Sequence, residues 1–355
     1  MILSSFSYKT SGWELTDINA LKLTNLLVGK NAAGKTRTIR AIQNVTSFLR
    51  AKYFVFKDNF FKAKLVFSNT NDANWNMTYV FEINKDEVKS EQLIVCGRVL
   101  IKRDTKKATL NGDTINPPTG KLVVQVRRDK EEYPDAEALM EWAEGVVAIS
   151  CSDINPFTIL NGPASYINPM SFSDLVDSLT KDEKKKVIEE AKELGYDIVD
   201  ISSLNANGDI KLVTVKERYL QGGVVDFQLS SGMLRVLYIL CFLLYIKHKD
   251  NLSMFLIDDL GEGLDYSRAT HLGEKVFEDC ERENIQLIAS SNDSFLMDVV
   301  DISKWQIVRR KNSKLSVLNQ TNQSDMFDMF RMTGLINFDL FSSDFIDNNI
   351  SSSSE

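Results

Sequence analysis

The sequence is poor in the residues that most often carry acid–base catalysis and bind transition metals. Its 355 residues include only two histidines, and neither lies near a serine, a cysteine or an acidic cluster. Catalysis by a Ser-His-Asp triad and zinc chemistry are therefore nearly excluded. The four cysteines lack the spacing of metal ligands, and three lie inside apolar stretches, which favours reduced core thiols in a cytoplasm. They are Cys96, Cys151, Cys241 and Cys280.

Long apolar runs and an excess of positive charge are absent as well. The longest wholly apolar run, residues 236–246, is far shorter than the roughly 20 residues that span a bilayer, and no secretory signal pattern opens the chain. We therefore expect a buried helix at this run, a cytoplasmic protein and no membrane partner. The formal net charge of -7 argues against a surface coated in positive charge, but it does not forbid a local basic track.

The arrangement of apolar residues predicts an α/β protein with an inserted β lobe. The first 50 residues and those after residue 251 alternate strand-like runs with helical patterns, which is typical of a parallel α/β sheet. Between residues 61 and 130, a series of short runs separated by turn signals such as Asn111-Gly112 indicates antiparallel strands. These runs are KLVF, TYVFEI, EQLIV, GRVLI and KLVVQV. Residues 131–204 look mostly helical, with a capping box at Thr180 and Glu183.

A phosphate-binding motif lies between a predicted strand and a predicted helix. Residues 29–36, GKNAAGKT, match the pattern G-x-x-x-x-G-K-[ST]. Backbone N–H groups of such a loop surround the β-phosphate, Lys35 can reach the β- and γ-phosphates, and the Thr36 hydroxyl can bind Mg²⁺. We therefore predict ATP and Mg²⁺ as ligands. The predicted ATP-binding residues are Gly29, Lys30, Asn31, Ala32, Ala33, Gly34, Lys35, Thr36 and Arg37.

Two further segments carry the pattern of a nucleotide site. In MFLIDDLGEGLD, residues 254–265, an apolar strand ends in Asp258, which can hold Mg²⁺ together with Thr36, and Asp259 can face the γ-phosphate. In FQLSSGMLRVL, residues 227–237, a serine and a glycine at a predicted helix N-terminus can grip a γ-phosphate. Alone, each segment is more simply interpreted as structural. For the acidic strand, the upstream phosphate loop makes the functional interpretation the better one.

Taken in this order, the three motifs resemble those of an ABC-type ATPase head. Residues 229–233, Leu229, Ser230, Ser231, Gly232 and Met233, resemble the LSGGQ-type signature of that family. More narrowly, the chain resembles the stand-alone "AAA family" ATP-binding proteins related to SMC proteins and to the OLD family, many of which serve in bacterial anti-phage defence. The resemblance covers residues 1–50 and 205–310.

The resemblance implies roles for the residues that follow the signature. Asp258 is then the Walker B acid, and Asp259 stands where the family has its catalytic glutamate. Leu264 and Asp265 correspond to the D-loop. Asn292, in IASSNDSFL, stands where the family usually has a histidine switch.

The resemblance also implies a fold and a division of the chain. We expect a P-loop NTPase with an ABC-ATPase-like α/β head, forming a single domain over residues 1–340. Its nucleotide-binding core comprises residues 1–60 and 205–320, the antiparallel β lobe residues 61–130, and the mostly helical lobe residues 131–204. The Ser- and Asn-rich residues 341–355 are expected to form a flexible or partner-bound tail.

Two departures from the family pattern point towards slow hydrolysis. Aspartate is one methylene shorter than glutamate, so Asp259 is expected to hold an attacking water poorly. Asn292 can donate a hydrogen bond to a phosphate oxygen but cannot become cationic. The glutamine of a Q-loop has no clear counterpart, and Gln125 is the one candidate.

The function that this resemblance implies is an ATP-dependent switch. ATP is expected to lie between the Walker motifs of one subunit and the signature of the other, so that the chain forms a homodimer. Its partner would be a separate effector chain, such as a nuclease or a toxin, because too few residues follow the last predicted strand for a nuclease domain in cis. Alternatives are a DNA-repair or SMC-like ATPase acting on nucleic acid, for which basic clusters leave room, and a transporter subunit.

Overall fold

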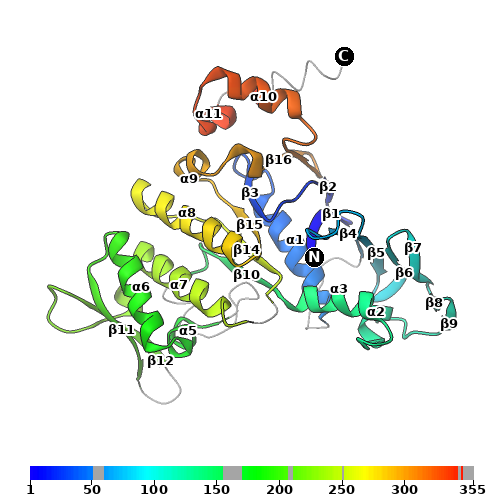
Figure 1. Ribbon diagram of the computed structural model, residues 1–355, viewed down its shortest axis with the longest axis horizontal. Helices are drawn as coiled ribbons and strands as arrows, with labels where there is room; N and C mark the ends of the chain where they lie inside the picture. The colour runs from blue at the N-terminus through cyan, green and yellow to red at the C-terminus, as the bar shows by residue number, and fades with distance from the viewer. Residues whose placement is uncertain (51–59, 155–169, 207–210, 250–251, 343–344, 347–355) are drawn as a thin grey trace.

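The structure is a computed structural model that describes the chain except for residues 51–59, 155–169, 207–210, 250–251, 343–344 and 347–355. Within the described residues, one sheet of 14 strands runs through the molecule in the order β10-β14-β15-β3-β16-β17-β2-β1-β4-β5-β6-β7-β8-β9. A separate sheet joins β11, β12 and β13. Figure 1 shows helices on both sides of the large sheet, with β11 and β12 in a lobe at lower left.

Five neighbouring strands, β10 to β16 in the sheet order, are parallel and carry the expected α/β pattern. The helix predicted after the phosphate-binding motif is present as α1, and strands and helices alternate after residue 251 as the sequence indicates. The parallel strands and their helices are β3 (Thr24–Val28), α1 (Lys35–Leu49), β10 (Val146–Ser150), β14 (Met254–Asp258), α8 (Tyr266–Arg282), β15 (Gln286–Ser290), α9 (Ser294–Val299), η2 (Ile302–Lys304) and β16 (Trp305–Lys311).

The parallel strands separate two hydrophobic cores. Side chains alternate between the two faces of a strand, and in β14 Met254 and Leu256 belong to one core while Phe255 and Ile257 belong to the other. The first pair packs in the core that contains α1, and the second pair in the core that contains α7 (Ser231–Ile246) and α8. The run at residues 236–246, predicted to be a buried helix, forms the C-terminal two thirds of α7.

The antiparallel lobe extends the same sheet through β1 and β2. The turn at Asn111-Gly112 has positive φ at both residues and joins β8 to β9, as expected for a tight hairpin. The other strands of this sheet pair antiparallel with their neighbours, except that β17 pairs in parallel with β2. They are β1 (Ile2–Thr10), β2 (Glu14–Ile18), β17 (Lys314–Leu318), β4 (Phe60–Ser68), β5 (Asn76–Asn84), β6 (Glu87–Val95), β7 (Arg98–Asp104), β8 (Lys107–Leu110) and β9 (Asp113–Ile115).

The prediction of a strand at KLVVQV, residues 121–126, is wrong. The segment forms a short helix, α2 (Val123–Val126). The buried Glu91 carboxylate accepts hydrogen bonds from the backbone N–H groups of Val123, at 2.7 Å, and Val124, at 3.3 Å. This tertiary contact satisfies the first N–H groups of the helix, and no local sequence pattern encodes it.

The region predicted as mostly helical, residues 131–204, also contains strands. Its helices are α3 (Pro134–Glu144), α5 (Phe172–Ser178) and α6 (Lys181–Glu193), and α6 begins with the predicted capping box at Thr180. β10 lies within this region but pairs in parallel with β14, so it belongs to the core sheet. The small sheet comprises β11 (Ile198–Asn205), β12 (Lys211–Glu217) and β13 (Val224–Val225), and η1 (Asp226–Gln228) leads into α7.

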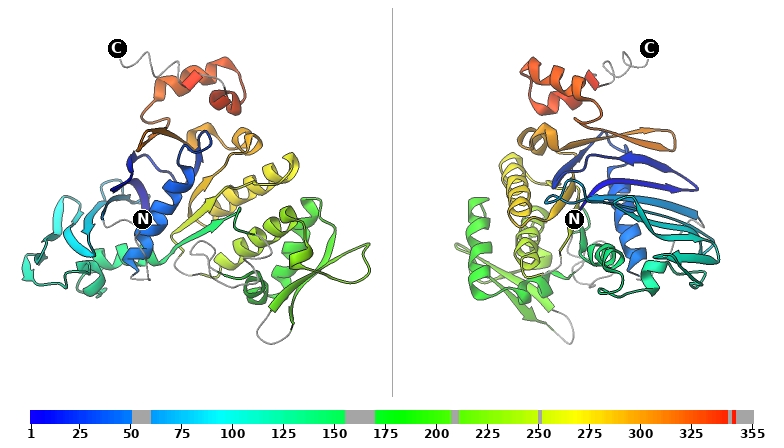
Figure 2. Two further views of the ribbon diagram at one scale, coloured as in Figure 1. Left: turned by 180° about the vertical axis from the view of Figure 1, so that it is seen from behind. Right: turned by 45° about the vertical axis from the view of Figure 1, so that its right-hand side comes forward.

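Two short helices, α10 (Ser324–Thr333) and α11 (Asn337–Ser342), follow the last strand and cap one end of the molecule (Figure 2). The expectation of a flexible tail from residue 341 is wrong for its first part. α11 extends into it, and Ile346 is buried while Phe345 packs edge-on against Phe330. The other residues of that segment lie outside the described part. Among the described residues, no helix is long and apolar enough to cross a membrane.

Candidate nucleotide-binding site

The phosphate loop occupies the position that its motif predicts, between the end of β3 and the start of α1. Gly34 has a φ of 111°, and a Cβ there would lie 2.3 Å from Cδ2 of Leu315. A Cβ on Gly29 would lie 2.7 Å from the carbonyl oxygen of Val308. Both positions therefore require glycine, because the loop passes directly against β16 and β17. Arg37 is exposed in the first turn of α1.

Lys35 lies inside the loop and bonds back to it. Its Nζ donates to the carbonyl oxygen of Gly29 at 2.7 Å, and only 6% of the residue is exposed. Burial lowers the pKa of the Lys35 ammonium, while the nearby carboxylates of Asp259 and Asp258 oppose that shift. A buried ammonium inside a glycine-containing loop at a helix N-terminus can donate hydrogen bonds to phosphate oxygens.

Asp258 connects the phosphate loop to the two central strands. Its Oδ1 accepts hydrogen bonds from the hydroxyl of Thr36 at 3.1 Å and from the hydroxyl of Ser290, at the end of β15, at 2.6 Å. A hydroxyl and a carboxylate are the oxygen ligands that Mg²⁺ takes beside substrate phosphates, so Thr36 and Asp258 fit the ion. No cluster of three or more His, Cys, Asp or Glu side chains in the described part of the chain would hold a metal by itself.

Asp259 is held in an unusual backbone conformation, with a φ of 57°. Its N–H donates to Ser290 Oγ at 3.0 Å, and its Oδ1 accepts from Nδ2 of Asn292 at 3.4 Å. Its Oδ2 accepts from the hydroxyl of Ser152 at 3.5 Å. Burial raises the pKa of the Asp259 carboxyl, and the charges of Asp258 and Glu262 raise it further. The structure thus brings Asp259 and Asn292 together, and it adds Ser152, which the sequence analysis missed.

The assignment of Gln125 to a Q-loop is wrong. Its Nε2 donates to the carbonyl oxygens of Phe48, at 2.6 Å, and Leu49, at 3.3 Å, at the C-terminal end of α1. The phosphate loop lies at the other end of that helix, about 20 Å away at 1.5 Å per residue. The strand whose carboxyl end lies beside that of β14 is β10, and not the segment that contains Gln125. The apolar run VVAIS followed by polar residues is the sequence signal that could have identified this strand.

The signature segment begins α7 as a capped helix. Ser230 is the N-cap and its hydroxyl accepts from the N–H of Met233 at 3.2 Å, which leaves the N–H groups of Ser231 and Gly232 in the first turn for a ligand. Leu229 and Met233 are buried and anchor the turn, while both serines are exposed. α7 and α1 pack in different cores, on opposite faces of the sheet (Figure 1).

The D-loop segment lies against the signature of the same chain. A Cβ on Gly232 would lie 3.3 Å from Cδ2 of Leu264 and 3.4 Å from the carbonyl oxygen of Gly263. Asp265 caps α8 and accepts from the N–H of Arg268 at 3.1 Å. The N-termini of α7 and α8 are therefore neighbours.

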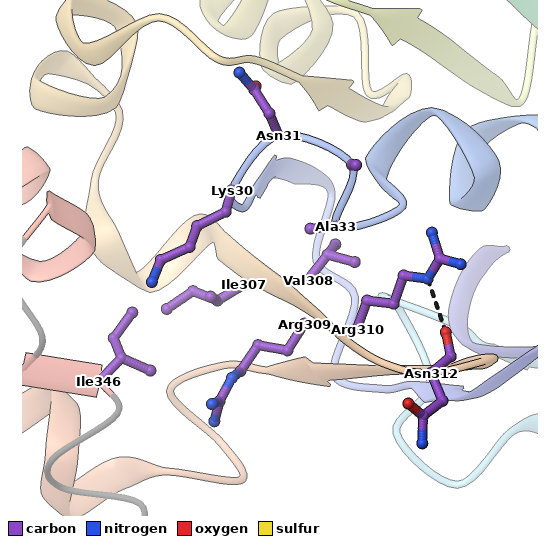
Figure 3. A pocket seen from close by; sticks show the side chains of 10 residues that line it. Lys30, Asn31, Ala33, Ile307, Val308, Arg309, Arg310, Asn312 and Ile346 are labelled. Atoms are coloured by element: carbon purple, nitrogen blue, oxygen red, sulfur yellow. Dashed lines mark hydrogen bonds between the residues drawn. The ribbon is translucent and has the colours of Figure 1, made fainter.

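A pocket of about 510 Å³ opens beside the phosphate loop (Figure 3). Figure 3 shows Lys30 reaching towards Ile307 and Ile346, and Arg310 donates from Nε to the carbonyl oxygen of Asn312 at 2.8 Å. Arg309 and Arg310 belong to one of the basic clusters of the sequence, together with Lys311. The residues that line the pocket are Lys30, Asn31, Ala32, Ala33, Ile307, Val308, Arg309, Arg310, Asn312 and Ile346.

Comparisons with known proteins identify the fold. Residues 157–298 match the family described as "AAA domain, putative AbiEii toxin, Type IV TA system". A search of curated proteins finds no match. The crystal structure of an SMC head bound to the C-winged helix domain of ScpA is similar with a TM-score of 0.57 and 11% identity, over 92% of this chain and 100% of that chain.

A second solved structure gives the same result. The SMC head domain with an extended coiled coil, bound to the C-terminal domain of ScpA derived from Pyrococcus furiosus, is similar with a TM-score of 0.50 and 11% identity. This similarity covers 93% of this chain and 99% of that chain. Identities this low establish the fold and not the partners. The chain therefore has the P-loop NTPase fold of an SMC-like, ABC-type ATPase head.

Proposed function

We propose that the chain binds ATP and Mg²⁺ and acts as a slowly hydrolysing, dimeric switch for a separate effector protein. The observation that carries the proposal is the hydrogen bond between Thr36 and Asp258, which joins the phosphate loop to the acidic strand end. Lys35 lies beside Asp258. On binding, the γ-phosphate would replace the Gly29 carbonyl as the hydrogen-bond acceptor of Lys35. The pocket bordered by Arg309 and Asn312 has room for the nucleoside.

The position of the signature supports a dimer. The exposed Ser231 and the free N–H groups of the first turn of α7 lie on a helix that packs on the face of the sheet opposite α1. A γ-phosphate in the phosphate loop would therefore meet the signature of a second copy. Two ATP molecules would then form part of the contact between the subunits, and hydrolysis would weaken it.

Slow hydrolysis follows from the residues beside the γ-phosphate position. Asp259 is the proposed general base. Its side chain is short, and its two carboxylate oxygens accept long hydrogen bonds from the neutral donors of Asn292 and Ser152. A misplaced base lowers the rate because proton transfer depends on geometry. The closed dimer would therefore persist and hold its effector for a long time.

The proposal also names the kind of effector and the biological setting. The family description of residues 157–298 names a toxin–antitoxin system, and the SMC head of known structure carries a winged helix domain of ScpA. We propose a comparable protein partner, a nuclease or a toxin, in bacterial anti-phage defence in the cytoplasm.

A second candidate function is an SMC-like ATPase that acts on nucleic acid. Likeness to SMC heads favours it. So does the outer face of the β lobe, where Lys64 and Lys102 lie exposed in one row across β4 to β7 with Val80 and Gln92 between them. Binding that weakens steeply with salt would be expected of this function.

A test of the proposed switch is the mass of the protein with and without nucleotide. Asp259→Asn should form a dimer with ATP and Mg²⁺, and a monomer with ADP, by light scattering. Thr36→Val is the matched control, because it removes the Mg²⁺-binding hydroxyl while keeping the shape of the side chain. A monomer in Asp259→Asn with saturating ATP would contradict the proposal.

A further inference from the structure

Ser152 lies at the carboxyl end of β10, and neither the motifs nor the comparisons give it a role. Its hydroxyl donates to Oδ2 of Asp259 at 3.5 Å, whereas Asn292 donates to Oδ1 at 3.4 Å. β10 and β15 are the two neighbours of β14 in the sheet. Each oxygen of Asp259 is therefore approached by a neutral donor from the segment that follows a different neighbouring strand.

The backbone fixes the position of Ser152. The N–H of Cys151 donates to the carbonyl oxygen of Asp258 at 2.9 Å, which continues the pairing of β10 with β14 beyond the strand. A turn follows, closed by bonds from Asp153 to Ser150, at 3.2 Å, and from Ile154 to Cys151, at 3.3 Å. Cys151 and Ile154 are buried, so the turn is anchored while Ser152 faces outwards.

A second serine extends the contact. Ser150 Oγ lies 3.2 Å from Ser152 Oγ, and either hydroxyl can be the donor. When Ser152 donates to Asp259, Ser150 can donate to Ser152, and such chains of hydrogen bonds strengthen one another. Ser150 therefore supports Ser152 through a second layer of hydrogen bonds, and such layers help to fix a reacting group in place.

We propose that Ser152 is a positioning residue for ATP hydrolysis, which holds the carboxylate of Asp259 in line with the attacking water. The inference rests on the proposed function, in which Asp259 takes a proton from that water. The water oxygen bonds to the γ-phosphorus, the bond from the γ-phosphorus to the bridging oxygen of ADP breaks, and the proton moves to Asp259. Because the aspartate side chain is short, the orientation of its carboxylate depends on hydrogen bonds to both oxygens. Asn292 donates to only one of them.

The test compares Ser152→Ala and Ser152→Thr with wild type in single-turnover hydrolysis and in ATP binding by calorimetry. Ser152→Ala should slow hydrolysis about tenfold and leave the Kd for ATP unchanged. Tenfold is the lower end of the effect of a hydrogen bond to a charged group, and we expect the lower end because this bond is long. Ser152→Thr keeps the hydroxyl at an exposed position and should recover most of the rate. Ser178→Ala is the control, since that hydroxyl donates to the carbonyl of Leu175, in α5.

A double mutant separates positioning from a structural role. If Ser152 acts through Asp259, adding Ser152→Ala to Asp259→Ala should cause no further loss of rate. A further loss there, or a wild-type rate in Ser152→Ala alone, would overturn the inference and leave the proposed function standing. A wild-type rate in Asp259→Ala would instead refute the proposed function, and the role of Ser152 would fall with it.

Discussion

Replacing Lys35 by methionine tests whether the phosphate loop binds nucleotide. The Lys35 ammonium now donates to the Gly29 carbonyl at 2.7 Å, and on binding it would exchange that oxygen for phosphate oxygens. Charge-assisted hydrogen bonds contribute about 1.5 to 3 kcal/mol, so the Kd for ATP should rise roughly 10- to 150-fold. Methionine has a similar length and no charge, so the loop should keep its shape.

The same substitution should leave the stability of the fold nearly unchanged. Burial lowers the pKa of Lys35, which means that the folded state disfavours the charged form. Removing the charge relieves that penalty but also removes the hydrogen bond to the Gly29 carbonyl, so the free energy of unfolding, measured in urea, should change by no more than about 1 kcal/mol. Lys186→Met, on the exposed face of α6, is the control for loss of a positive charge. A Kd for Lys35→Met within twofold of wild type, in a folded protein, would refute the assignment of the loop.

Three further substitutions test other parts of the account. Asp258→Asn should abolish the dependence of ATP affinity on Mg²⁺ in a calorimetric titration, and an unchanged dependence would contradict the metal assignment. Gly34→Ala should destabilise the fold by about 1 to 3 kcal/mol in urea unfolding, because its φ of 111° strains any side chain, and an unchanged stability would show that the loop relaxes. Arg103→Met should cost about 3 to 5 kcal/mol, because it leaves the buried Glu91 without a nearby positive charge and the carbonyls of residues 118 and 121 unpaired. A loss below 1 kcal/mol would contradict this estimate.

The parts of the fold that could be predicted from sequence are those whose signals are local. The glycines and lysine of the phosphate loop, the acids at the end of β14 and the capping box at Thr180 each specify their own structure within a few residues. The helix at the 236–246 run was predictable because an apolar segment of that length exceeds an ordinary strand.

The parts that could not be predicted depend on contacts between distant residues. α2 is helical because Glu91, in β6, caps its N-terminus, although KLVVQV has the composition of a strand. β10 is a short apolar run between two helices, and periodicity alone does not distinguish such a run from helix. Because β10 was not predicted, Ser152 was not identified either. Gln125 became the candidate for the Q-loop, but it contacts the end of α1 that is far from the phosphate loop.

The signature can be disabled at Ser231 with less damage to its own subunit than at Gly232. A bulky residue at Gly232 would strike Leu264 and the D-loop of its own chain, so it would damage the subunit that carries it. Ser231 is exposed at the first position of α7, where a glutamate is favourable to the helix but repels a γ-phosphate. Ser231→Glu is therefore the better lesion for the signature.

The central claim is that each ATP site combines the phosphate loop of one subunit with the signature of another, and mixing two inactive variants tests it. Lys35→Ala and Ser231→Glu should each hydrolyse little ATP alone. After equal mixing, half of the dimers should be heterodimers with one intact site, which gives about a quarter of the wild-type rate for a symmetric dimer. Recovery to that level is the result that we predict. Heterodimers shown by mass to form, but with no more activity than the parent proteins, would contradict the claim.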